Sequence, residues 1–151
     1  MSSVDHRQPG FCRSALWAGI LFLSAAAQAD DSTVMLVGGV KIASGEQIYA
    51  HICQGCHMPQ AQGAIGAGHY PKLAADPALS SWQYAALTVL GGRNGMPAFG
   101  WPAEEPMPFG VVRLSDQQVA EVVNFVRSHF GNRYPGTVTA AQVAALPHPA
   151  P

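Results

Sequence analysis

The stretch Cys53-Gln54-Gly55-Cys56-His57 decides how the rest of this sequence is interpreted. Its two cysteines are three positions apart, so on a helical turn their side chains lie on one face. The residue that follows the second cysteine is a histidine, whose imidazole is a common metal ligand. The motif therefore brings two thiols and one imidazole together on neighbouring turns of the chain.

This C-x-x-C-H spacing is the attachment signature of c-type haem. Thiols at Cys53 and Cys56 can bond the two vinyl groups on one edge of a porphyrin, and His57 can then reach the iron. We therefore expect one covalently bound haem c. Three other uses stay open: a zinc site, which needs a second Cys/His pair, a dithiol oxidoreductase, which needs a βαβ unit, and a structural disulfide.

Residues 1–29 have the three parts of a secretory signal peptide. Basic residues precede an apolar stretch at residues 15–27, which is shorter than the roughly 20 residues of a spanning helix. Ala27-Gln28-Ala29 then offers a small-x-small cleavage site. Cleavage there removes Cys12, so the cysteines that remain are those of the motif. We expect a periplasmic protein without stable membrane insertion after cleavage.

The composition indicates a single small domain that is rich in loops. The chain has 151 residues, of which 11% are charged, and its formal net charge is −1. Soluble domains usually have about 25% charged residues, and a chain without a basic excess is not expected to bind nucleic acid. Glycines and prolines gather in residues 58–75 and 91–113, which we expect to be long loops.

Helix-start signals organise the rest of the chain. Ser44 and Ser115 each begin a capping box, Ser-x-x-Gln, and Asp76-Pro77 is a typical helix start. A helix should therefore begin at each of these positions, and Thr139 should cap a last short one. Because no strand alternation is convincing, we predict an all-α fold.

We expect the sequence to consist of four segments. After the signal peptide, residues 30–43 form an extended lead-in and residues 44–131 form the domain. Residues 132–151 form a Pro-rich tail with its short helix. Within the domain we expect one helix to run from Ser44 through Ile52, a second from Asp76 to Gly91, and a third to be ended by Gly131.

An iron atom bound by one histidine needs a sixth ligand or keeps an open site. Met96 is the first candidate, because the glycine and proline around it can hold its side chain rigidly across a flat cofactor. Met107, which also precedes a proline, is the runner-up. The remaining alternatives are Met35, His51, His69 and His129.

Other residues are candidates for the surroundings of the haem. The proximal imidazole should donate its second N–H to a carbonyl group, and Pro71 is a plausible source, with an ordinary turn proline as the alternative. Arg93 could pair with a haem propionate, or be solvated. The aromatic residues expected in the haem pocket or the core are Trp82, Tyr84, Phe99, Trp101 and Phe125.

Taken together, the motifs resemble the class I c-type cytochromes over residues 44–131. The resemblance rests on C-x-x-C-H, Tyr70-Pro71-x-Leu73, Asn94-Gly-Met-Pro-Ala-Phe99 and Leu114-Ser-Asp-x-Gln118. It is greatest to monohaem cytochromes and cytochrome subunits that accept electrons from bacterial periplasmic dehydrogenases. It implies a small fold of three or more helices around one haem, with long loops. It also implies Cys53 and Cys56 as thioether anchors, His57 and Met96 as axial ligands, and Pro71 as the carbonyl partner.

The resemblance implies a single-electron carrier rather than an enzyme. Such a protein would accept electrons from a periplasmic dehydrogenase and pass them to a terminal oxidase or another cytochrome of the respiratory chain, either free or as a subunit of a complex. The alternative is a haem c enzyme or gas-binding sensor with a labile sixth ligand. The sequence departs from the family at Gly100–Arg113, which is unusually long and which we expect to contact a partner.

Overall fold

The computed structural model describes residues 35–37, 40–42, 44–66, 68–102 and 112–149. The chain divides into two compact units, Met1–Asp30 and Asp31–Pro151, and every described residue belongs to the second. The predicted signal peptide lies outside the described residues. Within the described part, no helix is both long enough and apolar enough to cross a membrane.

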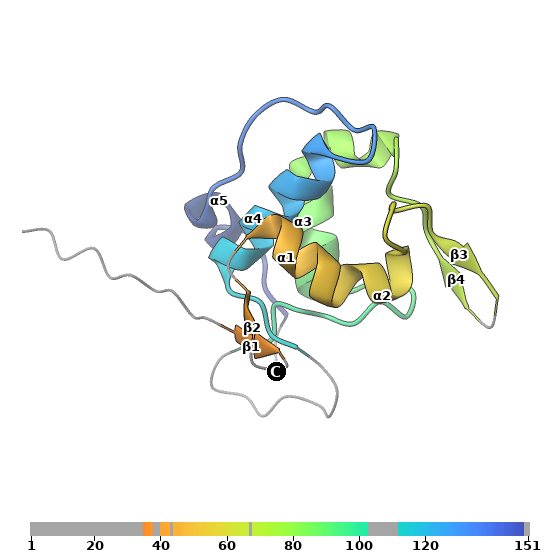
Figure 1. The fold of residues 1–151 in the computed structure, drawn as a ribbon. Coiled ribbons are helices and arrows are strands. Elements are labelled where there is room, and N and C mark those ends of the chain that lie inside the picture. The colour runs from red at the N-terminus through yellow and green to blue at the C-terminus, as the bar shows by residue number, and fades with distance from the viewer. Residues whose placement is uncertain (1–34, 38–39, 43, 67, 103–111, 150–151) are drawn as a thin grey trace, which may run out of the picture. The chain divides into compact units, whose positions relative to one another are not determined.

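An unbroken helical segment leads into the C-x-x-C-H motif (Figure 1). It consists of α1 (Gly45–Ile48), a π-helical turn η1 (Tyr49–Cys53) and α2 (Gln54–His57). The capping box predicted at Ser44 is confirmed, with its hydroxyl accepting from the Gln47 amide at 3.2 Å. The π-helical turn is a feature that sequence reasoning missed; such turns occur frequently at functional sites.

Two short hairpins correct the expectation that the chain has no strands. Strand β1 (Met35–Val37) pairs antiparallel with β2 (Val40–Ile42), inside the segment predicted to be an extended lead-in. Strand β3 (Ala64–Ile65) pairs antiparallel with β4 (His69–Tyr70), inside the loop predicted at residues 58–75. Strands of two or three residues are too short to show the alternation by which strands are recognised.

The second predicted helix is divided in two. Residues Pro77–Ser80 form a 3₁₀ turn, η2, and α3 covers Trp82–Gly91. Asp76 caps η2 as predicted, but Ser81 has an extended backbone, with φ −88° and ψ 106°. The Ser81 hydroxyl then caps α3 by accepting from the Tyr84 amide at 3.2 Å, so Ser81 ends one helical segment and begins the next.

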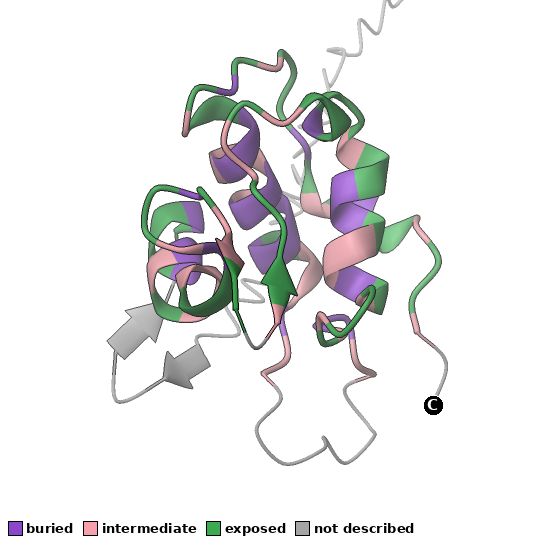
Figure 2. Cartoon of the chain, turned by 90° about the vertical axis from the view of Figure 1, so that its right-hand side faces the viewer, coloured by how far each residue is buried: buried purple, intermediate pink, exposed green. Residues whose placement is uncertain are grey.

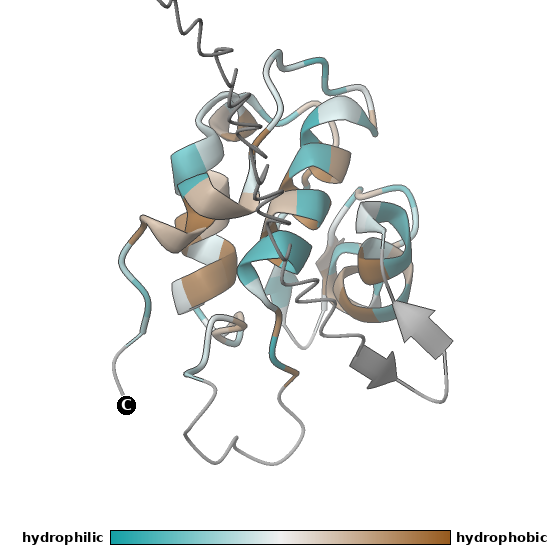
Figure 3. Ribbon diagram, turned by 90° about the vertical axis from the view of Figure 1, so that its left-hand side faces the viewer, coloured by the Kyte–Doolittle hydropathy of each residue, from teal (hydrophilic) through white to brown (hydrophobic). Residues whose placement is uncertain are grey.

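Helix α4 (Asp116–Ser128) is the packing centre of the described fold. It contacts α1, α3 and the short helix α5 (Ala140–Ala144). The capping boxes predicted at Ser115 and Thr139 are both confirmed. Figures 2 and 3 show the buried and the apolar sides of these helices. The valines of α4 that the helical spacing predicted to be internal are buried: Val119, Val122, Val123 and Val126.

The crossing of α1 and α4 requires a glycine. A Cβ atom at Gly45 would lie 2.1 Å from the Glu121 carbonyl oxygen and 2.8 Å from the Phe125 Cβ. These distances are far below ordinary van der Waals contact, so Gly45 lets the two backbones approach closely. Because α1 continues into the C-x-x-C-H motif, this crossing also determines where the motif lies.

Arg127, on α4, ties two loops to the helical core. Its side chain is 4% exposed, and Nε donates to the Leu79 carbonyl at 3.0 Å. The Nη atoms donate to the carbonyls of Gly136 and Pro135 at 3.1 and 3.0 Å. A buried guanidinium is acceptable when its donors are satisfied in this way, and here it joins η2 to the segment that follows α4.

Asn132 makes a second buried connection between distant segments. Its Oδ1 accepts from the Asp76 amide at 3.0 Å. Its Nδ2 donates to the Leu73 carbonyl at 2.9 Å and to the Val126 carbonyl at 2.7 Å. The end of the loop at residues 58–75 is therefore held against α4. This matters for the site, because Pro71 lies on that loop.

Candidate cofactor-binding site

The two cysteines of the motif lie where η1 meets α2. Cys53 is half-buried, Cys56 is exposed, and both are free thiols, which gives no support to the disulfide alternative. Burial, together with the neighbouring Cys56 thiol, raises the pKa of Cys53 to about 12. A dithiol oxidoreductase needs a cysteine of lowered pKa, so the environment of Cys53 argues against that alternative as well.

His57, the last residue of α2, is buried and has a fixed ring orientation. Its side chain is 7% exposed, and Nδ1 lies 2.9 Å from the Pro71 carbonyl oxygen. Because a carbonyl only accepts hydrogen bonds, Nδ1 must carry the proton. The lone pair of Nε2 is then available to a metal, and the carbonyl contact makes the imidazole a better ligand.

The chain between His57 and Pro71 is fastened to the end of α2. The Gly63 amide donates to the His57 carbonyl at 3.1 Å, and the amides of Leu73 and Ala74 both donate to the Ala61 carbonyl at 2.9 Å. Gly63 has a φ of +68°, and a Cβ there would lie 2.4 Å from the Tyr70 carbonyl oxygen. The turn at Gly63 and the shared Ala61 carbonyl thus set the position of the Pro71 carbonyl.

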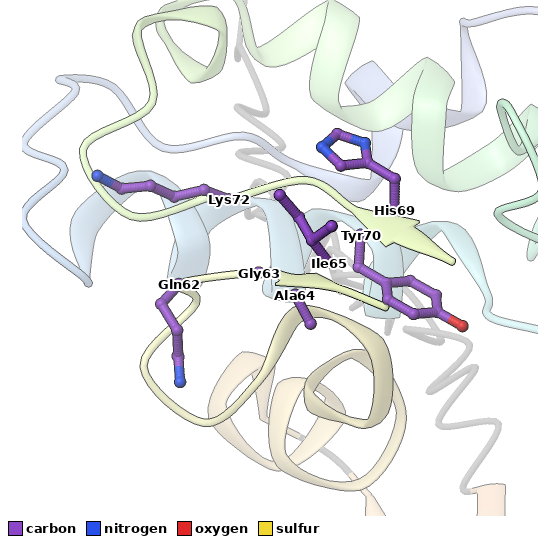
Figure 4. A pocket seen from close by; sticks show the side chains of 7 residues that line it. All are labelled: Gln62, Gly63, Ala64, Ile65, His69, Tyr70 and Lys72. Atoms are coloured by element: carbon purple, nitrogen blue, oxygen red, sulfur yellow. The ribbon is translucent and has the colours of Figure 1, made fainter. Parts of the chain in front are cut away.

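A pocket of about 390 Å³ lies at the β3–β4 hairpin, within this loop (Figure 4). Ile65 and His69 are directly paired across the hairpin and lie on the same side of it. Ile65 is 87% exposed, which is unusual for a large apolar side chain. The residues lining the pocket are Gln62–Ile65, His69, Tyr70 and Lys72.

Met96 follows a tight turn that sequence reasoning missed. The Arg93 amide donates to the Met96 carbonyl at 3.2 Å, and the Met96 amide donates to the Arg93 carbonyl at 2.9 Å. Asn94 and Gly95 both have positive φ, 49° and 90°, as in the Asn-Gly turns of tight hairpins. Gly92 has a φ of +68°, and a Cβ there would lie 2.4 Å from the Met96 carbonyl oxygen. The half-buried Met96 is therefore held on a rigid base.

The structure gives different surroundings to the other candidate residues. The Arg93 guanidinium donates to the Tyr84 hydroxyl at 2.7 Å, and both side chains are exposed; its pairing with a propionate stays a prediction. Phe99 is buried in the core, against which Trp82 and Phe125 also pack. The runner-up ligand, Met107, lies outside the described residues.

Tyr49 is a residue near the motif that sequence reasoning did not single out. It is 2% exposed, and its hydroxyl donates to the Met58 carbonyl at 2.8 Å. Its ring centroid lies 4.7 Å from that of Phe130. Burial raises the pKa of Tyr49 to about 12, so the hydroxyl stays a donor at neutral pH and holds the backbone just beyond His57.

The two ends of the long segment Gly100–Arg113 lie next to each other. The Leu114 amide donates to the Phe99 carbonyl at 2.8 Å. The Arg113 Nη2 donates to the Pro102 carbonyl at 2.6 Å. These two contacts bring the ends of the insertion together. Its residues 103–111 lie outside the described residues, so the expected contact with a partner stays a prediction.

The described side chains fit a covalently attached haem. They supply two free thiols near one end of a helical segment, an imidazole oriented by a carbonyl, and a thioether on a rigid turn. Among the described residues, no group of three or more His, Cys, Asp and Glu side chains could hold a metal ion. The zinc alternative therefore gains no support from the described residues.

Comparison with known proteins finds one matching family model and several similar proteins. The family model described as Cytochrome c matches residues 42–130. The alcohol dehydrogenase (quinone) cytochrome c subunit of Komagataeibacter europaeus is 36% identical over 121 residues, covering 78% of this chain and 25% of that protein. The gluconate 2-dehydrogenase cytochrome c subunit of Pantoea cypripedii is 38% identical over 115 residues, covering 68% of this chain and 24% of that protein.

A shorter relative aligns over nearly its whole length. Cytochrome c6 of Diacronema lutheri is 29% identical over 92 residues, which cover 60% of this chain and 98% of that protein. By contrast, the alignments span only about a quarter of the dehydrogenase subunits, 25% and 24%. The shared part is thus a single module, which in the dehydrogenase subunits belongs to a longer chain.

Proposed function

Because this chain belongs to the cytochrome c family, we propose that it is a periplasmic single-electron carrier that works with a dehydrogenase. The family binds haem c covalently, and Cys53 and Cys56 lie in the region that attaches it. The haem supplies an iron that takes up and releases one electron at a time. In this proposal the two cysteines are its thioether anchors, and His57 and Met96 are its axial ligands.

The contact between His57 and the Pro71 carbonyl is the observation that carries the proposal. It fixes the tautomer so that Nε2 can bind iron, and it does so in the residue directly after the second cysteine. The rigid turn that directly precedes Met96 supports this residue as the second axial ligand. A His/Met ligand pair raises the reduction potential of a haem, which suits a protein that accepts electrons from a dehydrogenase.

The partners belong to the proposal as well. Relatives named as cytochrome c subunits of quinone alcohol dehydrogenase and of gluconate 2-dehydrogenase support a periplasmic dehydrogenase as the electron donor. We propose a terminal oxidase or another cytochrome as the acceptor. A cbb3-type cytochrome c oxidase subunit that is 35% identical to this chain over 97 residues supports this choice.

Carbon monoxide binding and redox titration test this proposal. Protein made with the cytochrome maturation machinery should show one reversible one-electron transition. Its ferrous form should not bind carbon monoxide, because Met96 occupies the sixth position. The matched variant Met96→Ala should bind carbon monoxide while the haem stays attached. Rapid, strong binding by the unchanged protein would instead favour a gas sensor or haem enzyme.

A further inference from the structure

The chain has three asparagines, Asn94, Asn124 and Asn132, and their surroundings differ. Asn124 is held at both side-chain atoms, because Nδ2 donates to the Val138 carbonyl and Oδ1 accepts from the Val138 amide, each at 2.8 Å. Asn132 is 2% exposed, and its side chain makes three hydrogen bonds. Asn94 is exposed, and its carboxamide has no hydrogen-bond partner among the described residues. The Asn94 carboxamide is therefore free to turn toward its own main chain.

The residue after Asn94 leaves its main-chain nitrogen accessible. Gly95 is exposed, and a Cβ there would meet nothing within 4 Å. Its amide donates to no described residue, whereas the amides of Arg93 and Met96 close the turn. The other two asparagines are each followed by a residue with a bulky side chain. Asn94 thus combines a free carboxamide with an unobstructed amide nitrogen directly after it.

The turn can change its conformation without losing the bonds that close it. Hairpin turns of types I′ and II′ share a positive φ at the first central residue and differ in how the peptide group between the two central residues is oriented. The first central residue here is Asn94, with a φ of 49°, and the peptide group between Asn94 and Gly95 makes no hydrogen bond to a described residue. Gly95 can adopt a φ of either sign. This peptide group can therefore turn over and bring the Gly95 nitrogen toward the Asn94 carboxamide.

We propose that Asn94 is a site of spontaneous deamidation, in which the Gly95 main-chain nitrogen attacks the Asn94 carboxamide carbon. The new bond joins this nitrogen to Cγ, the Cγ–Nδ2 bond breaks, and ammonia leaves with the proton that the Gly95 nitrogen gives up. Water then opens the resulting succinimide ring. Opening at Cγ leaves an aspartate, and opening at the main-chain carbonyl leaves an isoaspartate. The net reaction takes up one water molecule and releases one ammonia molecule.

The isoaspartate product should disturb the base on which Met96 is held. Its main chain runs through Cβ and Cγ, so the connection between Arg93 and Met96 becomes longer by one carbon atom. The length of such a connection determines the turn and the pairing that it closes, and the two hydrogen bonds between Arg93 and Met96 should be lost. This step rests on the proposed function, in which Met96 is an axial ligand. The modification should then weaken the bond between the Met96 sulfur and the iron as the protein ages.

Peptide mapping by mass spectrometry tests the chemical step, on haem-loaded protein that has been aged in warm, mildly alkaline buffer. The Asn94 peptide should lose its amide and become a substrate for an isoaspartyl methyltransferase, whereas the peptides with Asn124 and Asn132 should keep their amides. Asn94→Gly is the matched control, because Gly-Gly also suits this turn and has no carboxamide; its peptide should contain no isoaspartate. An Asn94 amide that is retained, or is lost no faster than the other two, would overturn the inference.

Carbon monoxide binding by the ferrous protein tests the consequence for Met96. Aged wild type should gain binding in proportion to its isoaspartate content, whereas aged Asn94→Gly should gain none. Fresh Asn94→Asp, which carries the charge of the product on an ordinary main chain, should behave like fresh wild type. Isoaspartate without any gain in binding would overturn the effect on Met96. Binding by fresh wild type would instead refute Met96 as a ligand, and thus the proposed function itself.

Discussion

The crossing of α1 and α4 provides a quantitative test through the variant Gly45→Ala. The new Cβ would lie 2.1 Å from the Glu121 carbonyl oxygen, whereas ordinary van der Waals contact begins at 3.4 Å. The obstructing atoms are a backbone oxygen and the Phe125 Cβ, neither of which can rotate away. The helices must therefore separate, and overpacking of this kind costs about 1–3 kcal/mol or more.

A matched control separates the clash from the general effect of replacing glycine by alanine. Gly91 is the last residue of α3, and a Cβ there would meet nothing within 4 Å. Alanine is favoured over glycine in helices by up to about 1 kcal/mol, so Gly91→Ala should be neutral or slightly stabilising. Gly45→Ala should instead lower the free energy of unfolding by about 2 kcal/mol.

Urea unfolding of the haem-loaded protein measures both variants. Gly45→Ala should lower the midpoint at an unchanged slope, which would show that the effect is on stability. Because α1 continues into the motif that attaches the haem, the variant should also reduce the yield of haem-loaded protein. If Gly45→Ala were as stable as Gly91→Ala, the close contact between α1 and α4 would be refuted.

Three further predictions concern a buried cation, the proposed haem ligand Met96 and a surface ion pair. Arg127→Leu should lower the free energy of unfolding by about 1–3 kcal/mol, because it leaves the carbonyl of the buried Leu79 without its donor; the same change at the exposed Arg133 should have little effect in urea unfolding. Met96→Ala should abolish the sulfur-to-iron charge-transfer band of the ferric protein, and a retained band would transfer the role to Met107. The His148 Nε2 lies 2.7 Å from the Asp116 carboxylate, which raises the pKa of His148. The stabilisation that this pair provides should be complete below the ordinary histidine pKa of about 6.5 and be lost as the pH rises through the raised value. His148→Gln should therefore flatten this part of the curve of unfolding free energy against pH, and an unchanged curve would contradict the contact.

The helix starts were predictable because their signals are local. A hydroxyl and an amide three residues apart determine each capping box, and the boxes at Ser44, Ser115 and Thr139 all appear in the structure. The contact between His57 and the Pro71 carbonyl was also anticipated, from the need of a proximal imidazole for a carbonyl acceptor and from the resemblance. The capping boxes need no knowledge of how distant parts of the chain meet.

Some of the features that sequence reasoning missed depend on contacts between distant residues, and others are local. Asn132 joins Asp76, Leu73 and Val126 through its side chain, and no local pattern shows that an asparagine has these partners. The division of the second helix at Ser81 was missed because the helical spacing continues through it. The Asn94-Gly95 turn carried a readable signal, since this dipeptide favours positive φ at both positions, but it was interpreted only as part of a loop.

In the proposed function, two thioether bonds at Cys53 and Cys56 hold the haem on the chain. A pyridine haemochrome spectrum of the purified protein after acid–acetone extraction tests it most directly, because the extraction removes haem that is not covalently bound. The haem should stay with the polypeptide and show the spectrum of a haem whose two vinyl groups are saturated. Haem that passes into the acetone, or protein that carries none, would contradict it.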